Sequence, residues 1–222
     1  MSLDFSLMLP YISLLPAALG ITLKIGILGF VIAVGLSLVV GALRSHKLPK
    51  IISFILGFYV EFFRCTPLIV QLFFVYYGMP TIGVKIDPVF ASIVTMGLNS
   101  GAYMSENVRG AILSVDKGQY EAAKLLGFNS FQVNRYIVLP QAIRVAIPAF
   151  MNGFSTMIKE TSMASVLPVI ELTKLGNQIY AKTYHPFEIY ISLGVLYFVM
   201  TYSMTFVARK LERKATNGND RY

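Results

Sequence analysis

Long uninterrupted runs of apolar residues dominate the chain. Residues 25–43, 65–84, 88–105 and 189–208 contain no charged side chain. About 20 apolar residues are enough to cross the hydrocarbon core of a bilayer as a helix. The runs do not alternate apolar and polar positions as the strands of a transmembrane barrel do. The pattern therefore predicts an all-α integral membrane protein.

The apolar runs and their flanks divide the chain into one transmembrane domain with two short ends. Residues 1–14 are predicted to lie outside the membrane, residues 15–208 to form the domain, and residues 209–222 to form a polar tail. The first cation is Lys24, so the first span, and not a cleaved signal peptide, is expected to direct insertion. Five transmembrane helices are predicted, at about residues 15–43, 51–77, 88–113, 142–163 and 187–208.

Charge distribution predicts how these helices are oriented. The chain is 55% hydrophobic and 14% charged, with a net charge of +8. Lysine and arginine concentrate in residues 44–50, 117–144 and 209–221, whereas the segments on the opposite side hold Lys174, Lys182 and, further upstream, Lys85. Because positive loops stay in the cytoplasm, the N-terminus is predicted outside and the C-terminus in the cytoplasm. The positive charge is thereby explained without a nucleic-acid partner.

Several kinds of chemistry are excluded by residue content. The chain has two histidines and one cysteine, too few for an ordinary structural metal site or a Cys/His nucleophile. It contains no Gly-Lys dipeptide and hence no phosphate-binding P-loop. We therefore expect no catalytic residue, metal or cofactor in this chain, and any ATP that is used must be bound by another chain.

The connection between the third and fourth spans is predicted to form a helix, a tight turn and a second helix. Asp116 is suited to cap the first helix, with Gln119 in the position that completes a capping box. Gly127 suits the left-handed residue that ends such a helix. Asn129 or Ser130 then caps the second helix. An amphipathic surface loop would explain any one of these residues alone.

The complete spacing of this connection carries more information. Glu-Ala-Ala at 121–123 is followed by Gly127, Ile137 and Leu139-Pro140. This spacing resembles the signature loop of ABC importer permeases, in which a coupling helix fits a groove on the ATP-hydrolysing subunit. The resemblance implies that residues 114–140 form the coupling loop, with these residues at the ATPase contact: Glu121, Ala122, Ala123, Leu126 and Gly127.

Three further segments resemble the branch of this family that handles polar amino acids. They are Glu61 to Phe73, Asn99 to Glu106 and Lys159 to Ala164. Two positions depart from the branch, because Cys65 stands where it usually has glycine and Glu160 where it usually has aspartate. The resemblance implies a type I importer fold in a bacterial inner membrane.

The same resemblance implies a set of partners and a function. Two permeases, identical or similar, would form the pathway, and two ATPase subunits would bind ATP and magnesium. An extracytoplasmic binding protein would deliver a polar amino acid, such as cystine or a basic amino acid, for import into the cytoplasm. Two alternatives come from other classes: a secondary transporter or channel without an ATPase, and a membrane scaffold that transports nothing.

Charged and amide side chains within the predicted spans are candidates for the substrate pathway, because such groups are costly at membrane depth. An amino-acid zwitterion needs a carboxylate for its ammonium group and a donor for its own carboxylate. Glu61 and Glu160 suit the first role, and Arg64, Asn99 and Asn152 suit the second. Alternatively, Glu61 and Arg64, three residues apart on one helical face, neutralise each other.

Other conspicuous residues are assigned to structure. Gly97 and Gly101 form a small-xxx-small face that favours close helix packing. Tyr76, Tyr77 and Tyr103 are interpreted as anchors at the membrane interface or as packing residues.

Overall fold

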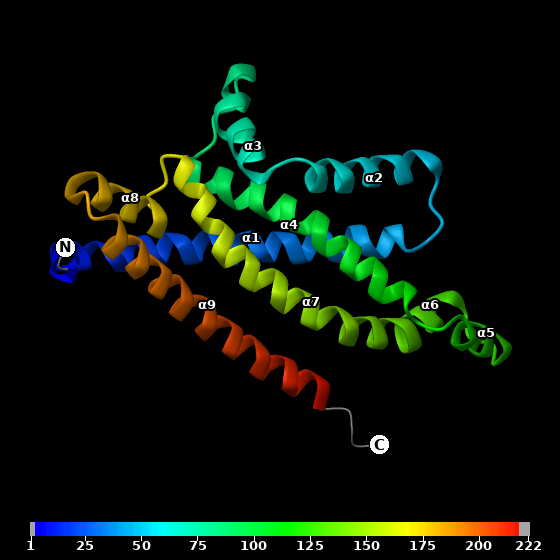
Figure 1. The fold of residues 1–222 in the computed structure, drawn as a ribbon. Coiled ribbons are helices and arrows are strands. Elements are labelled where there is room, and N and C mark those ends of the chain that lie inside the picture. Colours follow the sequence, from blue (N-terminus) through cyan, green and yellow to red (C-terminus); the bar gives the residue numbers. More distant parts are fainter. Residues whose placement is uncertain (1–2, 218–222) are drawn as a thin grey trace.

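The described part of the chain is a bundle of helices joined by short turns (Figure 1). The computed structural model describes residues 3–217, without the side chains of 207–209 and 211–217. The predicted all-α class is confirmed. The helices are α1 (Leu15–Arg44), α2 (Lys50–Cys65), α3 (Leu68–Phe73), α4 (Pro88–Leu113), α5 (Lys117–Leu125), α6 (Ser130–Val133), α7 (Leu139–Glu160), α8 (Leu172–Thr183) and α9 (Pro186–Asn217).

Irregular helical turns extend several of these helices. They are Phe5–Leu14 before α1, Phe74–Gly78 and Met79–Ile82 after α3, Asn134–Val138 before α7 and Thr161–Val166 after α7. The predicted polar tail begins inside α9, which continues to Asn217, and its last residues, 218–222, lie outside the described residues.

Three stretches of the described chain are long and apolar enough to cross a membrane: Phe5–Arg44, Ser130–Val166 and Pro186–Phe206. They contain the predicted spans at 15–43 and 142–163 and all but the last two residues of the one at 187–208. The predicted span at 88–113 coincides with α4, which is more polar but has much of its surface buried by other helices. A helix surrounded by protein can carry polar groups that a lipid-facing helix cannot. That α4 crosses the membrane stays a prediction.

The predicted span over residues 51–77 is not one continuous helix. The chain breaks after Cys65, and the helical segment Leu68–Ile82 is bent by 108° from α2. Pro67 has no amide hydrogen to donate, and it keeps Thr66 extended, with ψ of 143°. As a result, α3 points away from the bundle (Figure 1).

The centre of the bundle is the contact between α1 and α4. A Cβ atom on Gly41 would lie 2.6 Å from the Ser105 carbonyl oxygen, and one on Gly97 would lie 2.8 Å from Ile32. Gly101 packs against the side chain of Leu36 in the same way. The predicted packing role of the α4 glycines is therefore confirmed. Because residue numbers rise together along the contact, α1 and α4 run in the same direction.

A buried carboxylate holds α8 to the rest of the bundle, at the end away from α5 (Figure 1). Glu171 is completely buried and caps α8, accepting hydrogen bonds from the amides of Thr173 at 2.9 Å and Lys174 at 2.6 Å. It also accepts one from the Tyr197 hydroxyl of α9 at 3.0 Å. Burial raises the pKa of Glu171 above its usual value. The Leu172 amide donates to the Thr22 hydroxyl at 3.1 Å, which adds α1 to the junction.

Replacing Glu171 with alanine should lower the free energy of unfolding by about 2–4 kcal/mol, because it removes a helix cap and leaves buried donors without an acceptor. Asp87→Ala is the control, since Asp87 also caps a helix with two backbone amides but is exposed. The control should cost only about 1 kcal/mol. Thermal or denaturant unfolding of the purified protein in detergent measures both, and equal losses would show that the Tyr197 contact contributes nothing.

Candidate functional site

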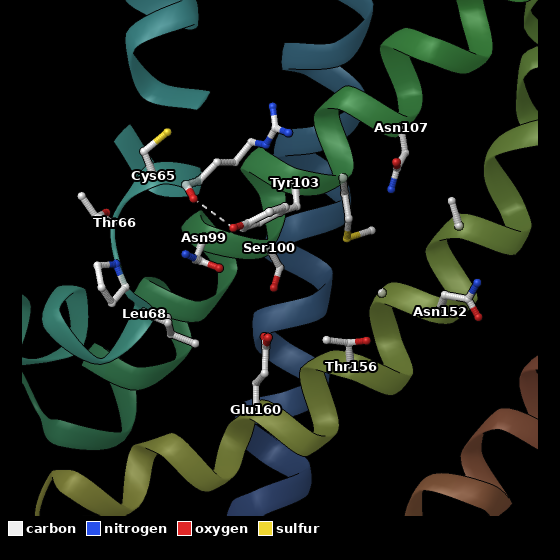
Figure 2. Close-up of a pocket in the computed structure, with 15 residues that line it drawn as sticks. Cys65, Thr66, Leu68, Asn99, Ser100, Tyr103, Asn107, Asn152, Thr156 and Glu160 are labelled. Carbon is white, nitrogen blue, oxygen red and sulfur yellow. Dashed lines mark hydrogen bonds between the residues drawn. The ribbon is translucent and has the colours of Figure 1, made fainter. Parts of the chain in front are cut away.

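The break between α2 and α3 opens a cavity of about 770 Å³ against α4 and α7. Four of the five residues predicted for the substrate pathway line it: Arg64, Asn99, Asn152 and Glu160 (Figure 2). The fifth, Glu61, lies outside the lining, and its side chain is 62% exposed. The structure therefore brings together one carboxylate, one guanidinium and two amides from three parts of the chain.

Two amide side chains satisfy the backbone that the break leaves open. Gln71 Nε2 donates to the carbonyl oxygens of Phe63 at 3.0 Å and Thr66 at 3.1 Å. Asn99 Nδ2 donates to the Phe63 carbonyl at 3.0 Å and to Gln71 Oε1 at 3.0 Å. With no water in the bilayer core, unpaired carbonyls at this depth would cost several kcal/mol each. These two amides therefore stabilise the break.

The role predicted for Asn99, as a donor to a substrate carboxylate, stays a prediction, and in this structure its amide group has partners within the protein. An amide nitrogen has two hydrogens to donate, and both of those on Asn99 are already used by Phe63 and Gln71. Asn99 lines the cavity, and its hydrogen bonds connect α4 to the break between α2 and α3.

Arg64 keeps its guanidinium available at the edge of the cavity. Its Nη1 lies 3.9 Å from the Glu61 carboxylate, too far for a charge-assisted hydrogen bond. The guanidinium carbon lies 5.6 Å from the centre of the Tyr103 ring, within the range of a cation–π contact. Tyr103 donates its hydroxyl hydrogen to the Arg64 carbonyl at 3.0 Å, drawn as a dashed line in Figure 2. Tyr103, predicted only as an anchor or packing residue, is thus part of the cavity wall.

The opposite wall is one face of α7. Asn152, Thr156 and Glu160 are spaced four residues apart, which places them in line along the helix. Figure 2 shows Glu160 and Thr156 directed from α7 toward α4, where Ser100 lies. Lys159, the neighbour of Glu160, lines a different groove between α7 and α9. The carboxylate of Glu160 therefore faces the cavity without the adjacent lysine.

Sequence reasoning missed several cavity residues with hydroxyl or amide groups. They are Thr66, Ser100, Asn107 and Thr156. Thr66, Ser100 and Thr156 carry neither a charge nor an amide group, whereas Asn107 is an amide in a predicted span and could have been found by the same rule as Asn99. The proline at 67, inside an otherwise apolar run, was the available signal that the helix breaks and that polar groups must gather beside it.

At the far end of α7, the loop between α4 and α7 has the predicted arrangement of helix, turn and helix. The Asp116 carboxylate caps α5 by accepting from the Gly118 amide at 2.7 Å. Gly127 has φ of +86°, as predicted for the residue that ends the helix. Asn129 and Gln132 form a reciprocal capping box on α6, with both hydrogen bonds at 2.9 Å. These caps are local interactions, and their prediction is confirmed.

The capping box predicted for α5 is wrong in its second half. Gln119 does not reach back to the start of α5, because its Oε1 accepts a hydrogen bond from Gln141 of α7 at 2.7 Å. A partner 22 residues away is not visible in a local pattern.

The surface that this loop presents is apolar. The side chains of Leu125, Leu126 and Phe131 are 89%, 78% and 75% exposed. Glu121, Ala122 and Gly127 are also exposed, whereas Ala123 is 3% exposed and packs inside the loop against Val133 and its neighbours. Ala123 therefore shapes the loop from within, and Leu125, which was not predicted, joins its outer face. Exposed apolar patches of this kind mark interaction surfaces.

Comparison with known proteins finds one family and several full-length relatives. Residues 33–217 match the family described as binding-protein-dependent transport system inner membrane component. The chain is 36% identical to the glutamine transport system permease protein of Escherichia coli (strain K12), over 96% of this chain and 98% of that protein. It is 37% identical to the arginine transport system permease protein of Bacillus subtilis (strain 168), over 96% and 98%.

A solved structure is similar over the same length. The crystal structure of an amino acid ABC transporter with histidines superimposes with a TM-score of 0.88 at 36% identity, and the match covers 96% of this chain and all of that chain. The predicted type I importer fold is therefore confirmed.

Gln71→Leu should lower the free energy of unfolding by about 2–4 kcal/mol, because it removes the donor to the Thr66 carbonyl and the acceptor of one Asn99 amide hydrogen, while the Phe63 carbonyl keeps its bond from Asn99. Gln178→Leu is the control, since Gln178 lies exposed on α8, and it should change stability by less than about 0.5 kcal/mol. Unfolding in detergent by denaturant measures the difference. A Gln71→Leu protein as stable as the control would contradict the proposed support of the break.

Proposed function

We propose, from the premise that the chain belongs to the family of binding-protein-dependent transport system inner membrane components, that it is the permease subunit of an ATP-driven importer of polar amino acids. The observation that carries this proposal is a cavity lined by a carboxylate and a guanidinium, connected by α7 to a loop with exposed apolar side chains. The relatives named for glutamine and arginine transport support the substrate class.

The cavity suits a zwitterion. Glu160 offers a carboxylate to an ammonium group, while Arg64 and Asn152 offer donors to a carboxylate. Thr156 and Ser100 provide further hydroxyl groups between them. These contacts are to the ammonium and carboxylate groups that all amino acids share. They do not distinguish one amino-acid side chain from another, so cystine, glutamine and the basic amino acids are all candidates.

The loop end of the molecule suits an ATPase partner. The residues proposed to contact it are Glu121, Ala122, Leu126 and Gly127, together with Leu125. ATP and magnesium would be bound in that partner. The concentration of lysine and arginine at this end supports a cytoplasmic location for the loop and the C-terminus, with the N-terminus outside.

The arm formed by α3 and the turns after it, Leu68–Ile82, supports assembly with a second permease, identical or similar. It leaves the bundle at the 108° bend and exposes Phe73, Phe74 and Tyr77. Substrate would arrive from an extracytoplasmic binding protein at the end of the bundle that carries α8. The secondary transporter and the scaffold have no support from the similarities, which are to components of ABC importers.

Glu160→Gln should weaken substrate binding and uptake by about 10- to 100-fold, the value of one charge-assisted hydrogen bond. The control is Glu61→Gln, because Glu61 lies outside the cavity and is exposed. The measurement is uptake of labelled amino acids by proteoliposomes containing the permease, its ATPase and the binding protein. Normal uptake by Glu160→Gln would contradict the proposed role of the carboxylate.

Gly127→Val should reduce the amount of substrate imported per ATP hydrolysed, because a β-branched residue at φ of +86° forces about 1–2 kcal/mol of strain on the end of α5. Gly83→Val is a matched control: Gly83 has the same φ of +86°, and both glycines have open space around them. Both variants carry the same strain. However, Gly83 lies shortly before the start of α4, whereas α5 follows the end of α4. Equal import per ATP in the two variants would argue against α5 as the coupling helix.

A further inference from the structure

Two consecutive residues of α5 form hydrogen bonds to different parts of the bundle. The first is Gln119, whose Oε1 accepts from Gln141 Nε2 at 2.7 Å. Gln141 lies in the first turn of α7, and the same nitrogen donates to the Ile137 carbonyl at 2.9 Å. The position of the Gln141 amide is therefore set by its own helix, and the contact with Gln119 attaches α5 directly to α7.

The second residue, Tyr120, begins a relay of side chains. Its hydroxyl donates to Asn134 Oδ1 at 2.6 Å, and Asn134 Nδ2 lies 3.5 Å from His46 Nε2. His46 Nδ1 lies 3.0 Å from the Ala42 carbonyl in the last turn of α1. Nδ1 also lies 2.9 Å from Ser45 Oγ, and in the tautomer with its hydrogen on Nδ1 the imidazole has Nε2 as an acceptor for Asn134. The relay attaches α5 to the end of α1.

These two helices lead to the two walls of the cavity. From Gln141, α7 runs as one helix, with Pro148 inside it, for about 29 Å to Glu160, at 1.5 Å per residue. The other helix, α1, packs tightly along α4, which carries Ser100 and Tyr103 in the facing wall. Each of the two contacts of α5 is thus connected to one wall.

The loop does not need either contact in order to fold. Its own apolar core consists of Val115, Ala123, Val133 and Val138, and its helices are capped by Asp116 and Asn129. Loss of the Gln119 or Tyr120 contact should therefore leave the loop folded and its outer face intact.

We propose that Gln119 and Tyr120 are positioning residues that transmit the displacement of α5 to the two cavity walls, Gln119 to α7 through Gln141 and Tyr120 to α1 and α4 through Asn134 and His46. The proposal rests on the proposed function, in which an ATPase moves α5. Both contacts are required, because the cavity opens only when its two walls move relative to each other.

The test uses the assembled importer in proteoliposomes, with substrate uptake and ATP hydrolysis measured in the same sample. Gln119→Leu and Gln141→Leu should each lower the substrate imported per ATP about five-fold, the factor expected for loss of one ordinary hydrogen bond. The double variant should be no worse than either single variant, because both remove the same contact. Lys117→Ala is the control: it is exposed on the same helix and should import as the unchanged protein does.

Two isosteric variants separate the hydrogen bond from side-chain volume and guard against poor folding of the leucine variants. Gln119→Glu keeps an acceptor for Gln141 and should retain import per ATP. Gln141→Glu removes the N–H donor and should lose about five-fold. The reverse order of effects would overturn the assignment of donor and acceptor.

The second contact is tested in the same way. Tyr120→Phe removes only the hydroxyl group, and Asn134→Leu removes its acceptor. Each should lower import per ATP, without additivity between them. Combining Tyr120→Phe with Gln119→Leu should multiply the two losses, because the contacts lead to different walls.

Other outcomes overturn the proposal in distinguishable ways. Unchanged import per ATP in the Gln119, Gln141, Tyr120 and Asn134 variants would show that the contacts transmit nothing. Loss of ATPase co-purification would show that Gln119 or Tyr120 belongs to the docking surface. Failure of the unchanged protein to recruit an ATPase at all would reject the proposed function itself, before any variant is compared.

Discussion

The structure depends on one constraint: a backbone carbonyl inside a bilayer needs a hydrogen-bond donor from the protein. Pro67 follows the break in the helix, and side chains satisfy the Phe63 and Thr66 carbonyls there. Gln71 and Asn99 supply the donors, and their mutual hydrogen bond ties the break to α4. The cavity exists because this break is stable, and the outward direction of α3 follows from the same bend.

A single helix, α7, connects the exposed loop at one end of the molecule to the cavity. Its first turn holds Gln141 beside the exposed loop, and its last turn holds Glu160 in the cavity. The consecutive charges at 159 and 160 line different grooves, Glu160 the cavity and Lys159 the groove between α7 and α9. An uncompensated carboxylate is costly in a membrane unless a ligand or water pairs with it. Its position in a cavity that also contains Arg64 suits the proposed binding of a zwitterion.

The tightly packed helices of the bundle explain how the loop at one end can be mechanically connected to the cavity. Glycines allow α1 and α4 to approach backbone to backbone, and Glu171 joins α8, α9 and the adjoining turn at the far end. Close-packed interiors have low compressibility and transmit strain. In the proposed mechanism, the few polar contacts of α5 therefore decide which helices move with it.

The sequence by itself determined the helical class, most helix boundaries and the caps of the loop, because hydrophobic runs, Asp116, Gly127 and Asn129 act on residues within a few positions of themselves. It also singled out four residues of the cavity, because charged and amide groups are rare in apolar spans. Only the tertiary structure decided what those groups bond to: Asn99 to a broken helix, Gln119 to α7, and Ala123 to the inside of its own loop. Each depends on partners distant in sequence or on which way a helix face turns. Local periodicity specifies a face, but packing against other helices selects its neighbour.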